Sequence, residues 1–280
     1  MVYKQTQLQR LRRAGAPLGR RSVRRVVARL GRSDAAHRAT LVLVTRTLQA
    51  QAIPYALAER ATLTRAIRAS LVITVGGDGT LLRAAHYLTT TPILGVNSDP
   101  GESQGVFCAT DARGFARTLA SLRAGRLPVV RLPRLGVGIN RRRLPELVLN
   151  DVLITHRNPG ASSRYRLQIG RRREEQISSG VWLATGAGST GAVRSAGGRV
   201  LPLNARRISF VVREPYPRRQ QRYQLTRGIL PAAGCASVTY LAPGGAVYLD
   251  GPHVRYPLAF GDEVCVWLAD EPLRAFGVRR

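Results

Sequence analysis

Apolar residues recur in two different patterns along the chain, and residues 23–125 carry the first of them. Short apolar runs of strand length alternate there with longer stretches of helical spacing. The expected strands are Arg25–Leu30, Tyr55–Ala58, Leu71–Val75 and Ile93–Val96, and the expected helices are Ala35–Ala50, Thr62–Ala69, Thr80–Leu88 and Asp111–Ala124. The run Leu41–Val44 would also suit a strand, but the length of its segment and the turn signal at Ile53–Pro54 favour a helix. Strands that alternate with helices predict a parallel sheet with right-handed crossovers.

After Arg126 the pattern changes to short segments in which apolar and polar residues alternate. Turns rich in glycine, proline and arginine separate these segments, and stretches long enough for a helix are scarce. The expected strands are Leu132–Ile139, Leu147–Ile154, Tyr165–Ile169, Gly180–Ala184, Ile208–Val212, Ala236–Tyr240, Ala246–Leu249 and Glu263–Leu268. This pattern is typical of a mostly antiparallel β domain.

Together the two patterns predict an α/β protein with an N-terminal doubly wound parallel-sheet domain and a second, mostly antiparallel β-rich domain. We expect residues 1–126 to form the first domain, with the tail 269–280 free to return to it, and residues 127–268 to form the second. No internal repeat and no low-complexity linker is visible. A cleft between two such domains is the default place for a ligand.

The chain of 280 residues carries a formal net charge of +28, and Lys4 is its only lysine. A field of this sign attracts polyanions, whether nucleic acid, nucleotide or polyphosphate. The arginine clusters lie in several separate segments, however, and not in one stripe. A general use of arginine in place of lysine, with no dedicated partner, therefore explains the charge equally well.

Cysteine content and hydropathy indicate in which cellular compartment the protein works. Three scattered cysteines suit neither a disulfide framework nor a CxxC metal site, so a reduced, cytoplasmic interior is the simplest interpretation. No run approaches the ~18 apolar residues of a membrane span, so no membrane partner is expected. The first 33 residues are basic and lack acids, as transit peptides do. Arginine is abundant everywhere, so we favour the cytoplasm and leave mitochondrial targeting by residues 1–20 open.

A glycine-rich turn follows the most apolar strand. Leu71–Val75 runs into Gly76-Gly77-Asp78-Gly79-Thr80 and then into a helix that carries Arg83. Open α/β sheets bind ligands beyond the carboxyl end of a strand, where glycines let the backbone approach closely and helix amides face an anion. A carboxylate would repel phosphate there, so Asp78 makes sense as the base for an attacking hydroxyl or as a ligand of magnesium. The alternative is that Asp78 only caps the helix.

A second turn, Thr185–Gly191, follows the strand candidate that ends at Ala184. Gly186, Gly188 and Gly191 fit the spacing GxGxxG, but neither a helix-length stretch nor an acidic residue about twenty positions later completes a Rossmann fingerprint. A turn dense in glycine, serine and threonine still suits contacts to phosphate or ribose. A plain β turn is the alternative.

Taken together, these residues resemble the NAD kinase family, whose signatures are a GGDGT turn in the first domain and a glycine-, serine- and threonine-rich turn in the β domain. The resemblance covers roughly residues 23–273 and is closest to the mitochondrial-type branch and its bacterial relatives. Smaller stretches that agree with this branch are Gly95–Pro100 with Ser103–Gly105, Asn150-Asp151, Ser178–Gly180, Thr185-Gly186, Arg213–Pro215 and Asp250-Gly251. GGDGT alone also occurs in diacylglycerol-type lipid kinases and, loosely, in phosphofructokinases, whereas the joint set is more specific.

The resemblance implies a phosphotransferase that moves a phosphoryl group from ATP or polyphosphate to the adenosine ribose 2′-hydroxyl of NAD, giving NADP. It implies that Asp78 is the catalytic base and that Asn150 and Asp151 hold the dinucleotide. The expected nucleotide-binding residues are Gly77, Gly79, Thr80, Arg83, Asn97, Asn150, Asp151, Ser179, Gly186, Gly188, Ser189, Thr190 and Ser195. Two positions depart from many members: Ser179 replaces an aspartate, and Ala192 replaces a tyrosine that stacks in the substrate pocket.

The partners implied are NAD with ATP or polyphosphate, and Mg²⁺ that arrives with the phosphoryl donor, because the sequence holds no visible metal cage. The resemblance also suggests a homodimer. A lipid kinase of the same superfamily is one alternative, although such enzymes usually carry a GTxND stretch where this chain has Gly95–Asp99. A non-catalytic basic nucleic-acid-binding protein is another. The signature residues are acidic or neutral and no aromatic stripe interleaves the arginines, so nucleic acid is not the expected partner.

Overall fold

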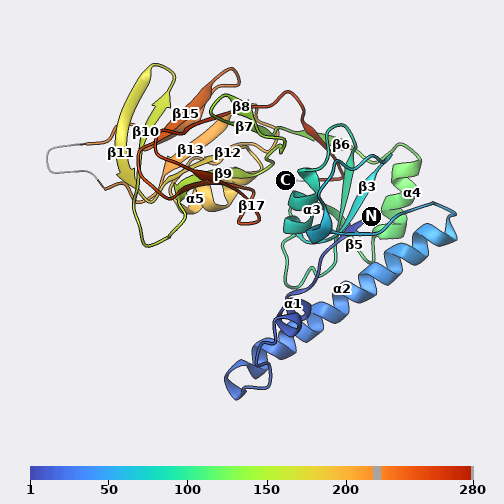
Figure 1. Cartoon of the computed structure of the whole chain (residues 1–280). Coiled ribbons are helices and arrows are strands. Elements are labelled where there is room, and N and C mark those ends of the chain that lie inside the picture. Colours follow the sequence, from blue (N-terminus) through green and yellow to red (C-terminus); the bar gives the residue numbers. More distant parts are fainter. Residues whose placement is uncertain (217–221, 279–280) are drawn as a thin grey trace. The chain divides into compact units, whose positions relative to one another are not determined.

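The structure is a computed structural model that describes residues 1–216 and 222–278 (Figure 1). It divides into two compact units. The α/β unit comprises Met1–Val130 together with the end of the chain from Arg274, and the β unit comprises Arg131–Leu273. A parallel sheet in the first and antiparallel sheets in the second confirm the predicted fold class.

A largely parallel sheet forms the centre of the α/β unit. Its strands follow the order β2-β1-β3-β4-β19-β6, and β5 also pairs with β4. The strands are β1 (Val2–Tyr3), β2 (Ala58–Glu59), β3 (Val72–Gly76), β4 (Ile93–Asn97), β5 (Cys108–Asp111), β6 (Val129–Leu132) and β19 (Leu273–Phe276). β3 and β4 are buried along their whole length, as expected for parallel strands covered on both faces.

Helices cover the sheet and extend beyond it. They are α1 (Gln7–Arg13), α2 (Arg24–Ala50), α3 (Asp78–Ala85) and α4 (Phe115–Arg123), with the 3₁₀ turns η1 (Arg21–Val23) and η2 (Arg60–Thr62). In Figure 1 α2 is the long blue helix, and α1 lies beside its first half. None of the described helices is long and apolar enough to cross a membrane.

Three local predictions in this unit are wrong. Arg25–Leu30, expected as a strand, belongs to α2. The buried residues of α2 recur at helical spacing, but polar residues such as Asp34 and His37 are among them. The apolar residues alone therefore do not show the helical period. Thr62–Ala69, expected as a helix, is irregular after the short turn η2, and Tyr55–Ala58 contributes only its last residue to β2.

The β unit consists of two antiparallel sheets. Their orders are β11-β10-β15-β18-β7-β8 and β14-β13-β12-β9-β16-β17. The strands are β7 (Leu135–Ile139), β8 (Arg142–Arg143), β9 (Asp151–His156), β10 (Ser163–Ile169), β11 (Arg172–Ser178), β12 (Val181–Ala184), β13 (Ile208–Val212), β14 (Arg227–Leu230), β15 (Cys235–Tyr240), β16 (Gly245–Leu249), β17 (Val254–Leu258) and β18 (Glu263–Leu268). One apolar core joins both sheets, because it contains Val137 and Val266 from the first with Ile154 and Val247 from the second.

The turn between β12 and β13 carries the only helical segments described in this unit, η3 (Gly188–Thr190) and α5 (Ala192–Ser195). The sequence pattern predicted two strands of the unit residue for residue, Ile208–Val212 and Glu263–Leu268. Strands β8, β11, β14 and β17 were not predicted. Arginine, glutamate or glycine interrupts the apolar pattern of the first three, and Pro257 in β17 argues against a strand.

Candidate active site

Four neighbouring strands of the α/β unit end at one edge of its sheet, which we call the carboxyl edge. Tyr3 of β1 pairs with Glu59 of β2 on one side and with Val75 of β3 on the other, so these strands end level with one another. The residues that follow β2, β1, β3 and β4, in that order across the sheet, are Arg60, Lys4, Gly77 and Ser98. This edge is where parallel sheets bind their ligands.

A cavity of about 450 Å³ lies at the carboxyl edge. The residues of the glycine turn that line it are Gly77, Asp78, Gly79 and Thr80. Its charged lining residues are Lys4, Arg10, Arg29, Arg60, Asp78, Asp99 and Glu102. A ligand in this cavity would therefore meet backbone amides and both signs of charge.

Asp78 is the first residue of α3, and its carboxylate does not cap the helix. Gly77 occupies the N-cap position without a side-chain hydrogen bond. The two carboxylate oxygens of Asp78 instead accept the backbone N–H groups of Val106 and Phe107, at 3.1 and 2.9 Å. Since an ionised carboxylate offers about four lone-pair sites, two of them stay open for a ligand. The half-buried side chain is thereby held in one orientation at the cavity wall.

Close packing leaves no room for a side chain at two of the three glycines of the turn, Gly76 and Gly77. A Cβ atom on Gly76 would lie 2.2 Å from the hydroxyl of Thr80, and one on Gly77 would lie 2.2 Å from the hydroxyl of Ser103. Gly79 is exposed and leaves the start of α3 open toward the cavity. The sequence GGDGT thus permits a turn that larger residues would block.

The other predicted residues of this unit have different surroundings. Thr80 is buried, and its hydroxyl has no hydrogen-bond partner among the described residues. Arg83 stacks on the ring of Tyr87, 5.2 Å from its centroid, and does not line the cavity. Asn97 donates from its side chain to the Ser103 carbonyl and accepts from the Asp99 backbone, so it shapes the loop after β4.

In the β unit, a buried carboxylate organises the Asn150–Asp151 segment. Asp250 accepts backbone N–H groups from Leu149, Asn150 and Asp151, at 2.9, 2.6 and 3.1 Å. Burial raises the pKa of Asp250 to about 6, against the opposing effect of these amides and of Arg134. Arg134 is itself fully buried, and burial lowers its pKa to about 10. Asp250 and Arg134 therefore form the charged centre beneath the predicted NAD contacts.

Asn150 and Asp151 differ in what they offer a ligand. The side-chain oxygen of Asn150 is buried and has no hydrogen-bond partner among the described residues. Burial, with the charge of Asp250 in second place, raises the pKa of Asp151 to about 7. Asp151 thus changes its protonation near neutral pH, where a carboxyl group can either donate or accept a hydrogen bond.

The glycine-, serine- and threonine-rich turn packs directly on Asn150. A Cβ on Gly188 would lie 2.2 Å from the Asn150 carbonyl oxygen, and one on Gly186 would lie 2.0 Å from the Pro202 carbonyl oxygen. The hydroxyl of Thr185 donates to the Leu149 carbonyl and accepts the amide of Ala187. Thr185, which sequence analysis gave no role, fixes this turn against the Asn150 segment.

The hydroxyl residues of the turn face different surroundings. Ser189 is fully buried. Its hydroxyl donates to the Gly186 carbonyl and accepts the Leu201 amide, so it stabilises the turn itself. Thr190 and Ser195 are exposed. Ser179, elsewhere in the unit, donates its hydroxyl to the exposed carboxylate of Glu214. The predicted residues Asn150, Asp151, Gly186 and Gly188 are brought together, and Ser179 is held by a separate contact.

Asp151 provides a pH-dependent prediction. Its pKa is about 7 in the folded chain against a reference value of 3.8, so the folded state holds the proton more tightly than the unfolded state. The stabilisation is complete below about pH 4 and is lost as the pH rises through 7. We therefore expect the Asp151→Asn variant to gain stability relative to the wild type between pH 4 and 8.

The measurement is urea unfolding followed by tryptophan fluorescence at several pH values. Both tryptophans, Trp182 and Trp267, lie in the β unit and report on it alone. Asp262→Asn is the matched control, because Asp262 belongs to the same unit but lies at an exposed turn, where its carboxylate accepts the Ala259 backbone amide and the Asn140 side-chain amide. A stability difference between wild type and Asp151→Asn that stays constant over this range would contradict the prediction.

Comparison with known proteins gives consistent results. A family model described as the ATP-NAD kinase N-terminal domain matches residues 23–121. A probable NADH kinase from Oryza sativa subsp. japonica is 35% identical over 249 residues, covering 81% of this chain and 77% of the rice protein.

Two solved structures share the fold at 21% sequence identity. An NAD kinase from Archaeoglobus fulgidus, in complex with ATP, superposes with a TM-score of 0.67 and covers 84% of this chain and 88% of its own. A yeast NADH kinase, in complex with NADH, gives a TM-score of 0.64 over 75% of this chain and 62% of the yeast chain. The chain therefore spans less than two thirds of that yeast protein.

Proposed function

The chain belongs to the NAD kinase family, and from this premise we propose that it transfers the terminal phosphoryl group of ATP to the adenosine ribose 2′-hydroxyl of NAD or NADH. The observation that carries the proposal is the carboxylate of Asp78, which two backbone amides fix in a cavity that is also lined by Lys4, Arg10 and Arg60. A lipid kinase and a nucleic-acid-binding protein are not favoured, since the matching relatives are NAD or NADH kinases.

The reaction needs a positioned nucleophile and a place for its proton. In the proposed step the 2′-oxygen attacks the terminal phosphorus of ATP, its proton passes to Asp78, and the bond from that phosphorus to the leaving oxygen of ADP breaks. The amides of Val106 and Phe107 hold the carboxylate still without occupying its remaining lone pairs. The products are NADP or NADPH and ADP.

A magnesium ion fits the cavity if it arrives with the donor. The described residues contain no group of three or more His, Cys, Asp or Glu side chains that could hold a metal alone. Mg²⁺ is commonly held by one or two carboxylates together with substrate phosphates. Asp99 lines the cavity, and its Oδ2 atom is buried without a hydrogen-bond partner, so this carboxylate suits such an ion. When bound, the ion would neutralise charge on the donor phosphates.

We assign the dinucleotide contacts to the β unit. The unpartnered side-chain oxygen of Asn150 and the carboxyl group of Asp151 can accept hydrogen bonds from ribose hydroxyls or from the adenine amino group. The exposed hydroxyls of Thr190 and Ser195 extend this surface. Ser189 is reassigned as a structural residue of the turn because its hydroxyl is occupied internally.

We also propose a cytoplasmic homo-oligomer. All three cysteines are free, which suits a reducing compartment. Residues 1–20 include β1, which pairs between β2 and β3 within the sheet. Removing that segment as a targeting peptide would take an inner strand from the α/β unit, so we favour its retention in the working enzyme.

A coupled assay tests the function. Purified full-length protein is mixed with ATP, MgCl₂ and either NAD or NADH, and the product is detected with an NADP-specific dehydrogenase or by NADPH absorbance after chromatography. We expect product that depends on ATP and on the dinucleotide. Absence of product with every pairing of donor and dinucleotide would contradict the proposal, and product from diacylglycerol instead would indicate the lipid-kinase alternative.

A further inference from the structure

Three basic side chains from two separate segments line the cavity at the carboxyl edge. Lys4 follows β1, Arg60 follows β2, and Arg10 lies one turn into α1. Strands β1 and β2 are adjacent and parallel, which places Lys4 beside Arg60. We call Lys4, Arg10 and Arg60 the cation cluster.

No direct ion pair in the part of the chain that the structure describes neutralises the charges of this cluster, although Asp78, Asp99 and Glu102 line the same cavity. Within the described residues, no hydrogen bond or ion pair joins the side chain of Lys4, Arg10 or Arg60 to a carboxylate. In contrast, Arg29 on the same cavity is paired with Glu102 at 2.7 Å. A group of like charges kept together without counter-ions costs free energy unless an anion joins them.

The pKa values of Lys4 and Arg60 are both lowered, as expected for half-buried cations that lie close together. Burial lowers the pKa of Lys4, and the charges of Arg60 and Arg10 lower it further, while Asp99 acts in the opposite direction. Burial likewise lowers the pKa of Arg60, followed by the charges of Arg10 and Arg83, while Glu59 acts in the opposite direction. A bound polyanion would relieve the mutual repulsion and restore the ordinary affinity of these groups for protons.

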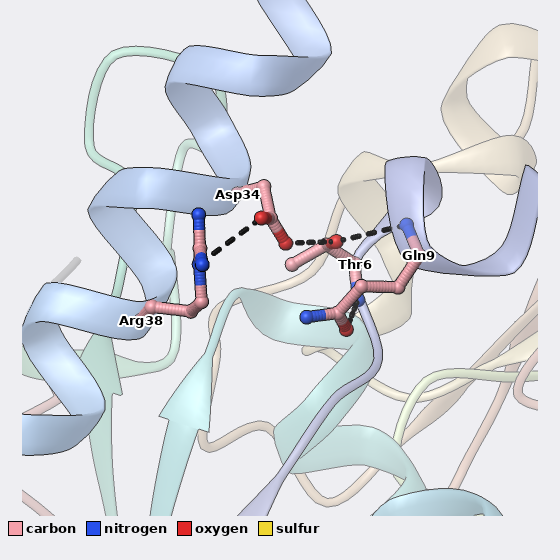
Figure 2. A network of polar contacts seen from close by, with 4 residues as sticks. All are labelled: Thr6, Gln9, Asp34 and Arg38. Carbon is pink, nitrogen blue, oxygen red and sulfur yellow. Dashed lines mark hydrogen bonds and ion pairs between the residues drawn. The ribbon is translucent and has the colours of Figure 1, made fainter. Parts of the chain in front are cut away.

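A buried polar network fixes the segment that carries Lys4 and Arg10. Thr6 caps α1 by accepting the amide of Gln9, and its hydroxyl donates to Asp34 of α2 at 2.6 Å (Figure 2). Asp34 is 4% exposed and also pairs with Arg38 at 3.1 Å. This network ties the N-terminal segment to α2, so Lys4 and Arg10 are presented to the cavity from a fixed backbone.

We propose that the cation cluster binds the linear phosphoanhydride chain of the phosphoryl donor, whether the triphosphate of ATP or an inorganic polyphosphate. This assignment rests on the proposed function and adds donor-binding residues to it. The family match begins at residue 23, so it assigns no role to Lys4 or Arg10. The cluster lies on the same cavity as Asp78, which places the donor chain where the attacking hydroxyl must meet it.

The first test compares kinetic constants of the single variants Lys4→Ala, Arg10→Ala and Arg60→Ala with those of the full-length wild type. Each loses one charged contact to phosphate, which corresponds to a rise in the donor KM of about tenfold. The NAD KM should stay within about twofold, since no contact to the dinucleotide is removed. Arg12→Ala is the matched control, because Arg12 lies on α1 but is exposed and does not line the cavity.

The two donor sources are separated by running each variant with Mg-ATP and with inorganic polyphosphate. A rise in KM for both indicates that the cluster recognises the phosphate chain itself. A rise for ATP alone identifies the nucleotide as the donor in use. An unchanged donor KM in all three variants, with wild-type turnover, would overturn the proposal while leaving the kinase function intact.

A binding measurement keeps the test independent of turnover. Titration calorimetry with inorganic tripolyphosphate should show binding to the wild type that weakens about tenfold in Lys4→Ala and Arg10→Ala and recovers in Lys4→Arg. Arg10 is exposed, so Arg10→Ala is expected to fold even if Lys4→Ala does not. Tripolyphosphate binding that depends on the cluster without NADP formation would refute the proposed function alone. Equal binding by wild type and Arg10→Ala would refute the cation cluster.

Discussion

The Asp78→Asn variant is expected to lose about 10³-fold in kcat, the middle of the range attributed to a general base. The substitution keeps the size of the side chain but removes its ability to take the 2′-hydroxyl proton. The KM for NAD should change by less than about threefold, because the proposed dinucleotide contacts lie in the β unit. The measurement is the coupled NADP assay, with kcat referred to the concentration of folded protein.

Asparagine also changes how the side chain is held. The carboxylate of Asp78 accepts two backbone amides, one on each oxygen. An asparagine side chain has one acceptor oxygen, so the amide of Val106 or Phe107 loses its partner, at a cost of about 1–3 kcal/mol. Thermal unfolding must therefore accompany the kinetics, to confirm that the variant is folded at the assay temperature.

Asp111→Asn provides a matched control for Asp78→Asn. Asp111 belongs to the same unit and its carboxylate accepts the Gly114 backbone amide at 2.9 Å, but it does not line the cavity of Asp78. We expect its kcat to stay close to that of the wild type. An Asp78→Asn enzyme with a near-normal kcat would exclude Asp78 as the base.

Strands were predicted best where both faces or one whole face are apolar. Leu71–Val75 and Ile93–Val96 correspond to β3 and β4 within one residue at each end, because buried parallel strands have continuous apolar runs. Helix α2 was only half predicted. Its first half extends past the sheet, and Asp34 and His37 occupy the buried stripe as polar network residues. A period calculated from apolar residues alone cannot detect such a face.

The glycine turn and Asp78 were recognised from sequence because a carboxylate between glycines after an apolar strand is unusual. The cation cluster was not, since the strands that align it, β1 and β2, have two residues each and no period to detect. The roles of Thr185, Arg134 and Asp250 were also missed. These residues act through backbone groups or buried charge, and the sequence contains no spacing rule for such contacts.

Asp250→Ala should destabilise the β unit by about 3–5 kcal/mol, because three backbone amides lose their buried acceptor at about 1–3 kcal/mol each. The variant leaves the amides of Leu149, Asn150 and Asp151 without their acceptor. It also removes one of the two charges that favour the buried Arg134 cation, the larger being that of Glu271. Urea unfolding followed by the fluorescence of Trp182 and Trp267 measures the loss. Since the same amides shape the Asn150–Asp151 segment, the KM for NAD should rise as well.

Three further variants separate the causes of that loss. Asp250→Asn keeps the shape and one acceptor, so it should fall between wild type and Asp250→Ala. Asp262→Ala removes a carboxylate that accepts the Ala259 backbone amide and the Asn140 side-chain amide at an exposed turn, and should cost only about 1–2 kcal/mol. In the double variant Asp250→Asn with Arg134→Met, the buried charge is removed together with its partner, so the combined loss should be smaller than the sum of the single losses. Strict additivity would mean that Asp250 acts only through the three amides and that its charge does not stabilise Arg134.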